Sequence, residues 1–264
     1  MLYNLKIEWL KIKNYRTFWI LAGLFVISIF GINYIGFAIE QETMKKAPEA
    51  GMILGTSRFL FPDVWGTIAY LSSFLLFIPG LLMIISITNE YSFKTHRQNI
   101  IDGWSRLDFI YVKLADAVIL ALGSTLIMFL AAFGFGISSG GFSSLSFSGS
   151  QYVFYFFMQA LSYILIALLF GVLFKRSGIA LGVFFLYAVV IENMAAGLLN
   201  RYAGGIGAYL PLESTDNLIP FPFLKNVVDQ VVKRPDTTYL LIAASIYLVF
   251  YFWICKRRFQ TDDL

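Results

Sequence analysis

The feature that most constrains this chain is the length of its uncharged segments. Residues 117–174 contain no charged side chain, and only a Ser- and Gly-rich stretch at 138–151 divides them. A transmembrane helix needs about 20 apolar residues to cross a hydrocarbon core of about 30 Å. A soluble domain has roughly 25% charged residues, whereas this chain has 14% and a mean hydropathy of +0.73. The sequence therefore predicts an all-α integral membrane protein.

Six segments are apolar and long enough to span a bilayer. They are residues 18–39, 65–88, 114–137, 152–174, 178–199 and 237–255, within a single transmembrane domain of residues 1–264. Inside the second segment, Pro79 and Gly80 predict a kink or local opening near the membrane centre. Residues 40–64 are expected to form a mixed-charge loop. The apolar stretches within 200–236 are too short to cross and predict a re-entrant or interfacial helical hairpin.

Residues 1–16 combine basic and apolar side chains at helical spacing. The pattern predicts an amphipathic helix that lies at the membrane interface. The alternative is an ordinary basic flank that only sets topology. The apolar face carries Leu5, Trp9 and Ile12, and the basic residues are Lys6, Lys11, Lys13 and Arg16.

The basic residues also predict which side of the membrane each loop occupies. With six spans both termini lie on one side, and thirteen Lys and Arg residues fall on that side against seven on the other. Because cytoplasmic loops carry an excess of Lys and Arg, we expect both termini and residues 89–113 to be cytoplasmic.

Residues 89–113 form a charged interruption between two apolar runs, and we interpret them as a docking surface rather than a solvated loop. Residues 90–102 are expected to form a short polar helix that Gly103 ends. Ser105 and Asp108 have the capping-box spacing of a new helix start. The polar residues expected to point away from lipid are Lys94, Arg97, Gln98, Asn99 and Asp102.

This segment resembles the first cytoplasmic loop of type-2 ABC exporter permeases. The resemblance lies in Glu90 at the end of the second span, followed by Thr95, Arg97, Ser105-Arg106 and Lys113. The sequence has Lys94 where the family usually has glycine, and Gly103-Trp104 where proline is common. The wider pattern is also similar: an N-terminal elbow helix, six spans, a cytoplasmic coupling helix and an external re-entrant hairpin before the last span.

The resemblance implies a permease subunit in a bacterial inner membrane. A separate ABC ATPase dimer would bind ATP and Mg²⁺, dock on the coupling segment and elbow, and drive export of an amphipathic small molecule, peptide or lipid-like substrate. A second permease chain, identical or related, would complete the channel within membrane lipid. The implied coupling residues are Glu90, Lys94, Thr95, Arg97, Gln98, Asn99, Asp102, Ser105 and Arg106.

This chain contains no Gly-x-x-x-x-Gly-Lys-Ser/Thr phosphate loop, so any ATP chemistry needs a partner. A single His and a single Cys exclude a metal cluster of these ligands, and we expect no catalytic residue and no metal or cofactor in the chain. Its basic residues flank apolar runs, which argues against nucleic-acid binding.

Several polar and aromatic residues inside the spans are candidates for a translocation path. Glu192 is costly near hydrocarbon and predicts a gate, a substrate contact or an interfacial carboxyl bonded to the hairpin. An ion-coupled carrier or channel using Glu192 is the alternative function. Asp116 is expected to pair locally with Lys113, and Asn33 to bond between helices. The path residues are Ser72, Pro79, Phe184, Phe185, Tyr187, Glu192 and Asn193.

Overall fold

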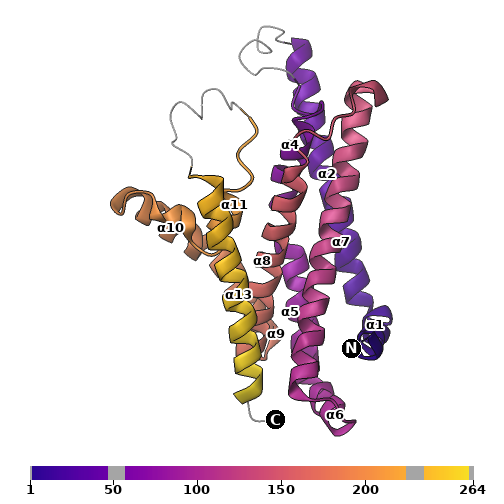
Figure 1. Cartoon of the computed structure of the whole chain (residues 1–264). Helices are drawn as coiled ribbons and strands as arrows, with labels where there is room; N and C mark the ends of the chain where they lie inside the picture. The colour runs from indigo at the N-terminus through magenta and orange to yellow at the C-terminus, as the bar shows by residue number, and fades with distance from the viewer. Residues whose placement is uncertain (1, 47–56, 224–234, 262–264) are drawn as a thin grey trace.

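The computed structural model describes residues 2–46, 57–223 and 235–261, and it contains helices and no strand in those ranges (Figure 1). Five helices there are long and apolar enough to cross a membrane. They are α2 (Arg16–Lys46), α7 (Arg106–Gly140), α8 (Gln151–Phe174), the continuous helix Ser177–Tyr202 and α13 (Thr237–Thr261). A bent pair, α4 (Val64–Ser73) and α5 (Phe77–Ser92), makes a sixth if the two count as one span. The chain is thus an all-helical, multi-pass membrane protein.

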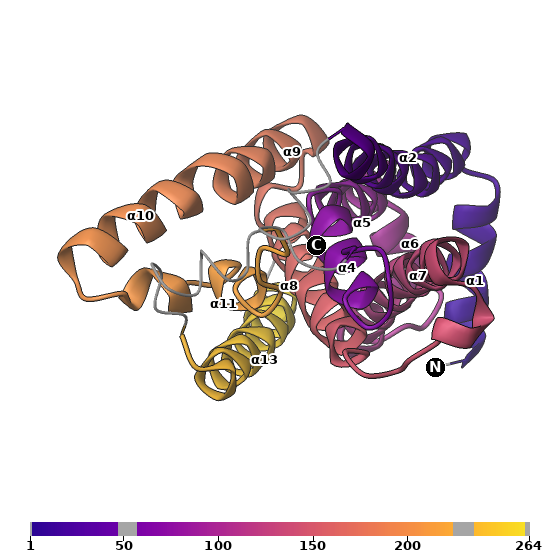
Figure 2. The same ribbon diagram turned by 90° about the horizontal axis from the view of Figure 1, so that it is seen from above.

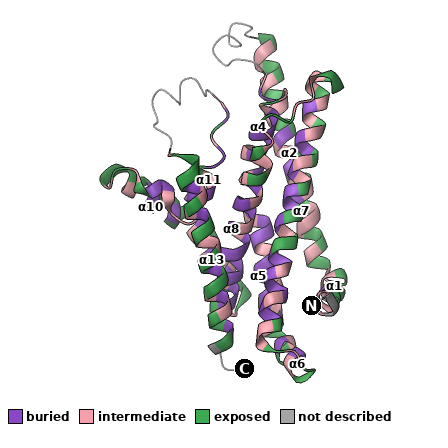
Figure 3. Cartoon of the chain, viewed as in Figure 1, coloured by how far each residue is buried: buried purple, intermediate pink, exposed green. Residues whose placement is uncertain are grey.

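Helix α8 is the centre of the bundle. Two thirds of its most apolar window is buried, against one third or less in the four other unbroken spanning helices. It packs against α4, α5, α7 and α13, as the buried residues in Figure 3 and the view from above in Figure 2 show. At its closest approach to α5, Gly171 leaves no room for a Cβ against Ile87. This close approach brings the two backbones together, as small residues do between membrane helices.

The first helix, α1 (Leu2–Lys13), the short helix α6 (Thr95–Ile101) and the last turns of α13 lie at one end of the bundle (Figure 1). At this end Phe109 stacks on Phe259 with ring centroids 4.5 Å apart. Arg106 donates a hydrogen bond to the Gln260 carbonyl at 2.9 Å. The end of the last helix is therefore attached to the start of α7.

The predicted loop at 40–64 is wrong in its first part, because α2 continues as a helix to Lys46. Lys46 pairs with Glu42 one turn earlier at 2.6 Å. Thr43 donates a hydrogen bond to the Ile39 carbonyl at 2.8 Å. Such i,i+4 pairs stabilise a helix that has already left the apolar run. Residues 47–56 of the predicted loop lie outside the described residues.

The kink in the second span occurs, but it precedes Pro79 instead of centring on it. Helices α4 and α5 meet at 47° across residues 74–76. Pro79 is the third residue of α5, where its missing N–H would be unpaired in any helix. Its ring would clash with the Leu75 carbonyl of a continuous helix, so the chain bends before it.

Other spans match the predicted segments in their middle and differ at their ends. Helix α8 begins one residue before the predicted span and ends with it, whereas α7 and α13 extend beyond theirs. The fifth predicted span holds α9 (Ser177–Leu186), a π-helical turn η2 (Tyr187–Ile191) and α10 (Glu192–Tyr202). Helix α10 projects to one side of the bundle (Figures 1 and 2).

The predicted hairpin at 200–236 is short and irregular in its described part. It contains a 3-10 turn, η3 (Ile206–Tyr209), and one helical turn, α11 (Glu213–Asp216). Helix α11 packs against α8, α10 and α13. Residues 224–234 of this prediction lie outside the described residues.

Candidate functional site: a charged junction at one end of the bundle

Five charged side chains from three helices meet at the end of the bundle where α1 lies. We call Glu8, Lys11, Glu90, Lys113 and Asp116 the charged junction. Lys113 forms a very short contact with Glu8 and lies 2.6 Å from Glu90 and 3.7 Å from Asp116. Lys11 lies 2.7 Å from Glu8 and 3.1 Å from Glu90. The junction thus ties α1, α5 and α7 together.

The junction is buried, which makes its pairing energetically important. Lys113 is fully buried, and Glu8 and Glu90 are nearly so. Removing one partner from such a pair leaves an uncompensated buried charge, which costs about 3–5 kcal/mol. The local Lys113–Asp116 pair predicted from the sequence is present, and the structure adds it to this larger group.

Helical spacing explains how α1 and α7 each contribute two charged groups to the junction. Glu8 and Lys11 are three residues apart on α1, and Lys113 and Asp116 are three apart on α7. Residues at this spacing share one face of a helix. Glu90 is on the last turns of α5, opposite both pairs. The polar face of α1 therefore points into the bundle at Glu8, while Trp9 beside it is half exposed.

Helix α6 is joined to the junction through Glu90. Thr95 donates a hydrogen bond to Glu90 Oε2 at 3.3 Å, and His96 Nδ1 lies 2.9 Å from the Glu90 carbonyl oxygen. Lys94 adopts a left-handed conformation with φ 56°, which separates α5 from α6. The segment after α5 is thus a turn followed by a helix, attached at its first residues to a buried carboxylate.

The end of α6 and the start of α7 follow the sequence prediction. Gly103 has φ 100°, a region that glycine enters without steric cost. Ser105 accepts a hydrogen bond from the Asp108 amide at 3.0 Å, and Asp108 accepts one from the Ser105 amide at 3.2 Å. This reciprocal pair is the predicted capping box, and it sets the start of α7.

The outer side of residues 93–102 is exposed and carries both apolar and charged or polar side chains. Phe93 and Ile101 are 73% and 78% exposed, and the charged or polar Lys94, Arg97 and Gln98 lie near them. Asp102 is exposed as well, and it accepts a hydrogen bond from Gln98 at 3.0 Å. Asn99, the remaining residue of the predicted docking surface on α6, is not part of this exposed side, since it is buried on the inner face of the helix.

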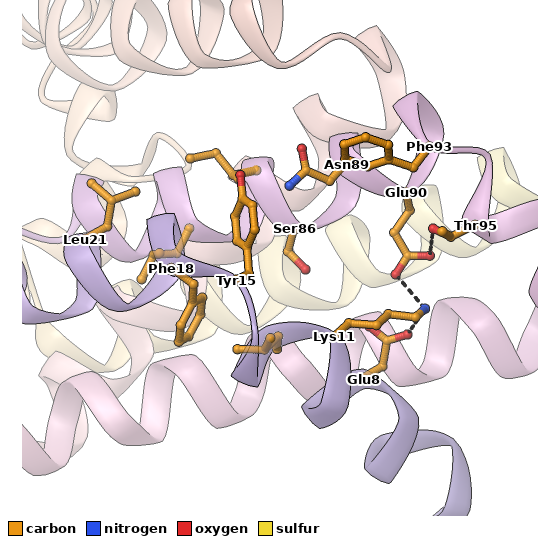
Figure 4. Close-up of a pocket in the computed structure, with 13 residues that line it drawn as sticks. Glu8, Lys11, Tyr15, Phe18, Leu21, Ser86, Asn89, Glu90, Phe93 and Thr95 are labelled. Atoms are coloured by element: carbon orange, nitrogen blue, oxygen red, sulfur yellow. Dashed lines mark hydrogen bonds and ion pairs between the residues drawn. The ribbon is translucent and has the colours of Figure 1, made fainter.

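A cavity of about 180 Å³ opens beside the junction, between α1, α2 and α5 (Figure 4). Its polar end is formed by Glu8, Lys11, Glu90 and Thr95, and Ser86 and Asn89 lie along α5. Its other walls are apolar or aromatic, and they are Ile12, Tyr15, Phe18, Leu21, Leu82, Ile85 and Phe93.

Only part of this site was predicted from the sequence. Glu90 and Thr95 lie in it, whereas Ser105 and Arg106 lie on the adjoining helix start. Glu8 was missed, and Lys113 and Asp116 were seen only as a local pair. A signal was present in the sequence: Glu8 is the sole acid in residues 1–39, and Glu90 is the sole acid in residues 64–101.

A second polar group lies away from the junction, where residues 203–223 meet α8. Asp216 accepts hydrogen bonds from Gln159 at 2.8 Å and from Tyr163 at 3.1 Å. Burial, together with the neighbouring acids Glu213 and Glu192, raises the pKa of the Asp216 carboxyl to about 7, while the hydrogen bonds from Gln159 and Tyr163 act in the opposite direction. Burial likewise raises the pKa of Glu213.

Glu192 holds the same segment from the other side. Its Oε1 accepts a very short hydrogen bond from the Leu212 amide and another from the Glu213 amide at 3.1 Å. This geometry has the form of the predicted carboxyl bonded to the hairpin. Asn193, next to it, donates to the Ala188 and Val189 carbonyls at 3.1 and 3.3 Å, within the π-helical turn.

The remaining predicted path residues make separate packing contacts. Ser72 is buried and accepts a hydrogen bond from Asn33 at 3.0 Å, so Asn33 does bond between helices as predicted. Phe184 is buried against Gly80, one residue after Pro79. Phe185 is exposed, and Tyr187 packs on Phe170 with ring centroids 5.5 Å apart. Within the described ranges no group of three or more His, Cys, Asp or Glu residues could hold a metal ion.

The chain belongs to the DUF2705 family, described as proteins of unknown function, whose profile matches residues 56–264. The match covers α4 to α13 and so includes Glu90, Lys113 and Asp116, while Glu8 and Lys11 precede it. A comparison with curated proteins gave no match.

Proposed function

We propose that this chain is the membrane-spanning permease subunit of an ATP-driven ABC exporter. ATP and Mg²⁺ would bind to a separate ATPase dimer that docks on residues 93–102 and on α1. The exported substrate would be an amphipathic small molecule, a peptide or a lipid-like molecule. A second permease chain, identical or related, would complete the translocation path.

The observation that carries this proposal is the two-sided character of the segment around α6. Its outer side exposes Phe93, Arg97 and Ile101, a mixture of apolar and cationic groups that suits a protein partner. Its inner side is bonded to Glu90, which is paired with Lys113 of α7. A partner that moves α6 would therefore move the ends of α5 and α7 with it.

The position of α1 supports the elbow assignment. In Figure 1 it lies across the end of the bundle rather than along it. Its exposed Trp9 and the neighbouring Trp19, whose ring centroids are 6.2 Å apart, are typical of the membrane–water interface. With the excess of basic residues at this end, we assign α1, α6 and both termini to the cytoplasmic side of a bacterial inner membrane.

The proposal extends to the path and the opposite end of the bundle. There, residues 203–223 would form the external re-entrant element, held by Glu192 and Asp216. Spans two and five would line the path, since Phe184 of α9 packs directly on Gly80 of α5. A shift of α5 would then displace α9 through this contact.

The test begins by purifying the tagged chain from membranes of its own host. We expect an ATPase that contains a phosphate loop to co-purify, and the complex in proteoliposomes to hydrolyse ATP. Replacing Arg97 and Ile101 on the exposed side of α6 (Arg97→Ala with Ile101→Ser) should reduce the amount of bound ATPase by about tenfold or more. That is the loss expected for two central contacts of an interface.

The matched control is Arg201→Ala, which removes an exposed arginine from α10 outside the proposed docking surface. It should leave ATPase binding unchanged. The proposal fails if no ATPase accompanies the chain, or if the α6 variant binds its ATPase as tightly as the parent does.

An ion-coupled carrier or channel is the second candidate, because the buried Glu192 and the partly buried Asp216 are acids close to the spans, and no salt bridge to either is present in the described part of the chain. Vesicles that contain the purified chain alone distinguish the two. Proton or cation flux without ATP that is lost in Glu192→Gln would favour the carrier. Flux that requires the ATPase and ATP would favour the exporter.

A further inference from the structure

The cavity beside the charged junction has the chemical profile of a lipid site. One end is polar, with Lys11, Glu90 and Asn89, and the other is formed by Phe18, Leu21 and other apolar side chains (Figure 4). Its volume is about 180 Å³. A phospholipid likewise has a polar headgroup at one end and apolar acyl chains at the other.

The cavity also lies where a lipid headgroup would lie. Trp9 and Trp19 are half exposed and mark the depth of the membrane interface. Trp19 Nε1 donates a hydrogen bond to the Lys13 carbonyl at 3.1 Å, which fixes the turn between α1 and α2 at this depth. The cavity is formed by residues on both sides of that turn, Ile12 and Phe18 among them.

The exposed charges on α1 beside the cavity are basic, and the two acids that line the cavity, Glu8 and Glu90, are each paired with Lys11 and Lys113. On α1 and the turn after it, the exposed charged side chains of residues 4–16 are Lys6, Lys13 and Arg16, all cations. The one acid there, Glu8, is buried in the junction. Basic residues near an anionic membrane surface are attracted to it.

Lys11 is the junction group placed to contact a headgroup. Its side chain is 30% exposed, whereas that of Lys113 is 1% exposed. A lysine ammonium has three donors, and two are used by Glu8 and Glu90. The third is available to a phosphate oxygen, and the Asn89 and Ser86 side chains in the same cavity provide further donors.

We propose that this cavity binds one anionic phospholipid of the surrounding bilayer, with its phosphate at Lys11 and one acyl chain against Phe18, Leu21, Leu82 and Ile85. The lipid fills the space between α1, α2 and α5. It therefore secures α1 to the bundle in addition to the ion pairs. This inference does not rest on the proposed transport function.

The experiment measures lipid binding to the purified full-length chain by native mass spectrometry, with phosphatidylglycerol and phosphatidylcholine as probes. We expect one phosphatidylglycerol to stay bound under conditions that remove phosphatidylcholine. Lys11→Gln should weaken phosphatidylglycerol binding about tenfold, the effect of one charge-assisted hydrogen bond. Lys45→Gln, an exposed lysine at the far end of α2, is the control and should have no effect.

Because Lys11 also pairs with Glu8 and Glu90, a second variant leaves the charges intact. Ser86→Phe fills the cavity from α5 and should remove the bound lipid while the variant elutes and melts as a folded protein. The inference is overturned if Ser86→Phe keeps its lipid, if the two lipids bind equally, or if millimolar inorganic phosphate displaces phosphatidylglycerol completely. The last result would identify a soluble anion site.

Discussion

Two lysine–glutamate pairs in this chain have the same length and opposite environments, and they allow a controlled test of the charged junction. Lys113 and Glu90 are 2.6 Å apart with side chains 1% and 5% exposed. Lys46 and Glu42 are also 2.6 Å apart, with side chains 76% and 66% exposed. If burial decides the importance of a pair, Lys113→Met and Lys46→Met should differ greatly in effect.

The magnitudes follow from the surroundings of each lysine. Lys113→Met leaves Glu8 and Glu90 buried with only Lys11 to compensate them, which costs about 3–5 kcal/mol. Lys46→Met removes an exposed i,i+4 pair worth roughly 0.3–0.5 kcal/mol. At about 2–4 °C per kcal/mol for a chain of this size, the melting temperature should fall by about 6–20 °C in the first variant and by about 2 °C or less in the second.

The assay is the apparent melting temperature in one detergent at one heating rate, followed by tryptophan fluorescence. A fixed rate is needed because membrane proteins of this kind often unfold irreversibly. Equal shifts in the two variants would refute the reasoning, as would a shift below about 2 °C for Lys113→Met. Adding Glu8→Gln to Lys113→Met removes one of the stranded charges, so the double variant should melt closer to the parent than the sum of the single effects predicts.

Three further predictions use the same assay. Gly80→Ala should cost about 1–3 kcal/mol, because a Cβ there would lie 2.5 Å from Phe184 Cζ, whereas Gly123→Ala, with open space around it, should be neutral or stabilising. Ser105→Ala removes the cap of α7 and should cost about 0.5–2 kcal/mol, with faster amide exchange in its first turn. The pKa of Asp216 is raised to about 7, so its protonation stabilises the fold; this contribution is fully present below pH 4 and is lost as pH rises through 7. Asp216→Asn should remove this pH dependence of the melting temperature. An unchanged dependence of the melting temperature on pH would contradict the prediction.

The membrane class and most helix positions followed from the sequence alone. Long uncharged runs have one stable solution in a bilayer, since every backbone polar group must be paired within its own segment. The capping box at Ser105 and the stop at Gly103 were also predictable, because each depends on neighbouring residues only. Two details were missed although they too depend on nearby residues, namely the continuation of α2 to Lys46 and the position of the bend before Pro79.

The charged junction was likewise predictable only in part. Its i,i+3 pairs, Glu8 with Lys11 and Lys113 with Asp116, can be found by spacing. That Lys113 pairs most closely with Glu8, 105 residues away, cannot, because the pairing depends on how α1 crosses α5 and α7. The inward position of Asn99 has the same origin, since a seven-residue helix has no periodicity long enough to define its buried face.

The sequence by itself thus determined that this is a multi-pass helical membrane protein and where its polar interruption lies, because hydrocarbon thickness and backbone pairing act on each segment separately. Only the tertiary structure decided that the interruption has an exposed outer side and an inner side bonded to Glu90, which belongs to a group of buried charges from three helices. A buried charge needs an opposite charge beside it, and these residues, distant in the sequence, become buried together only once the helices have packed.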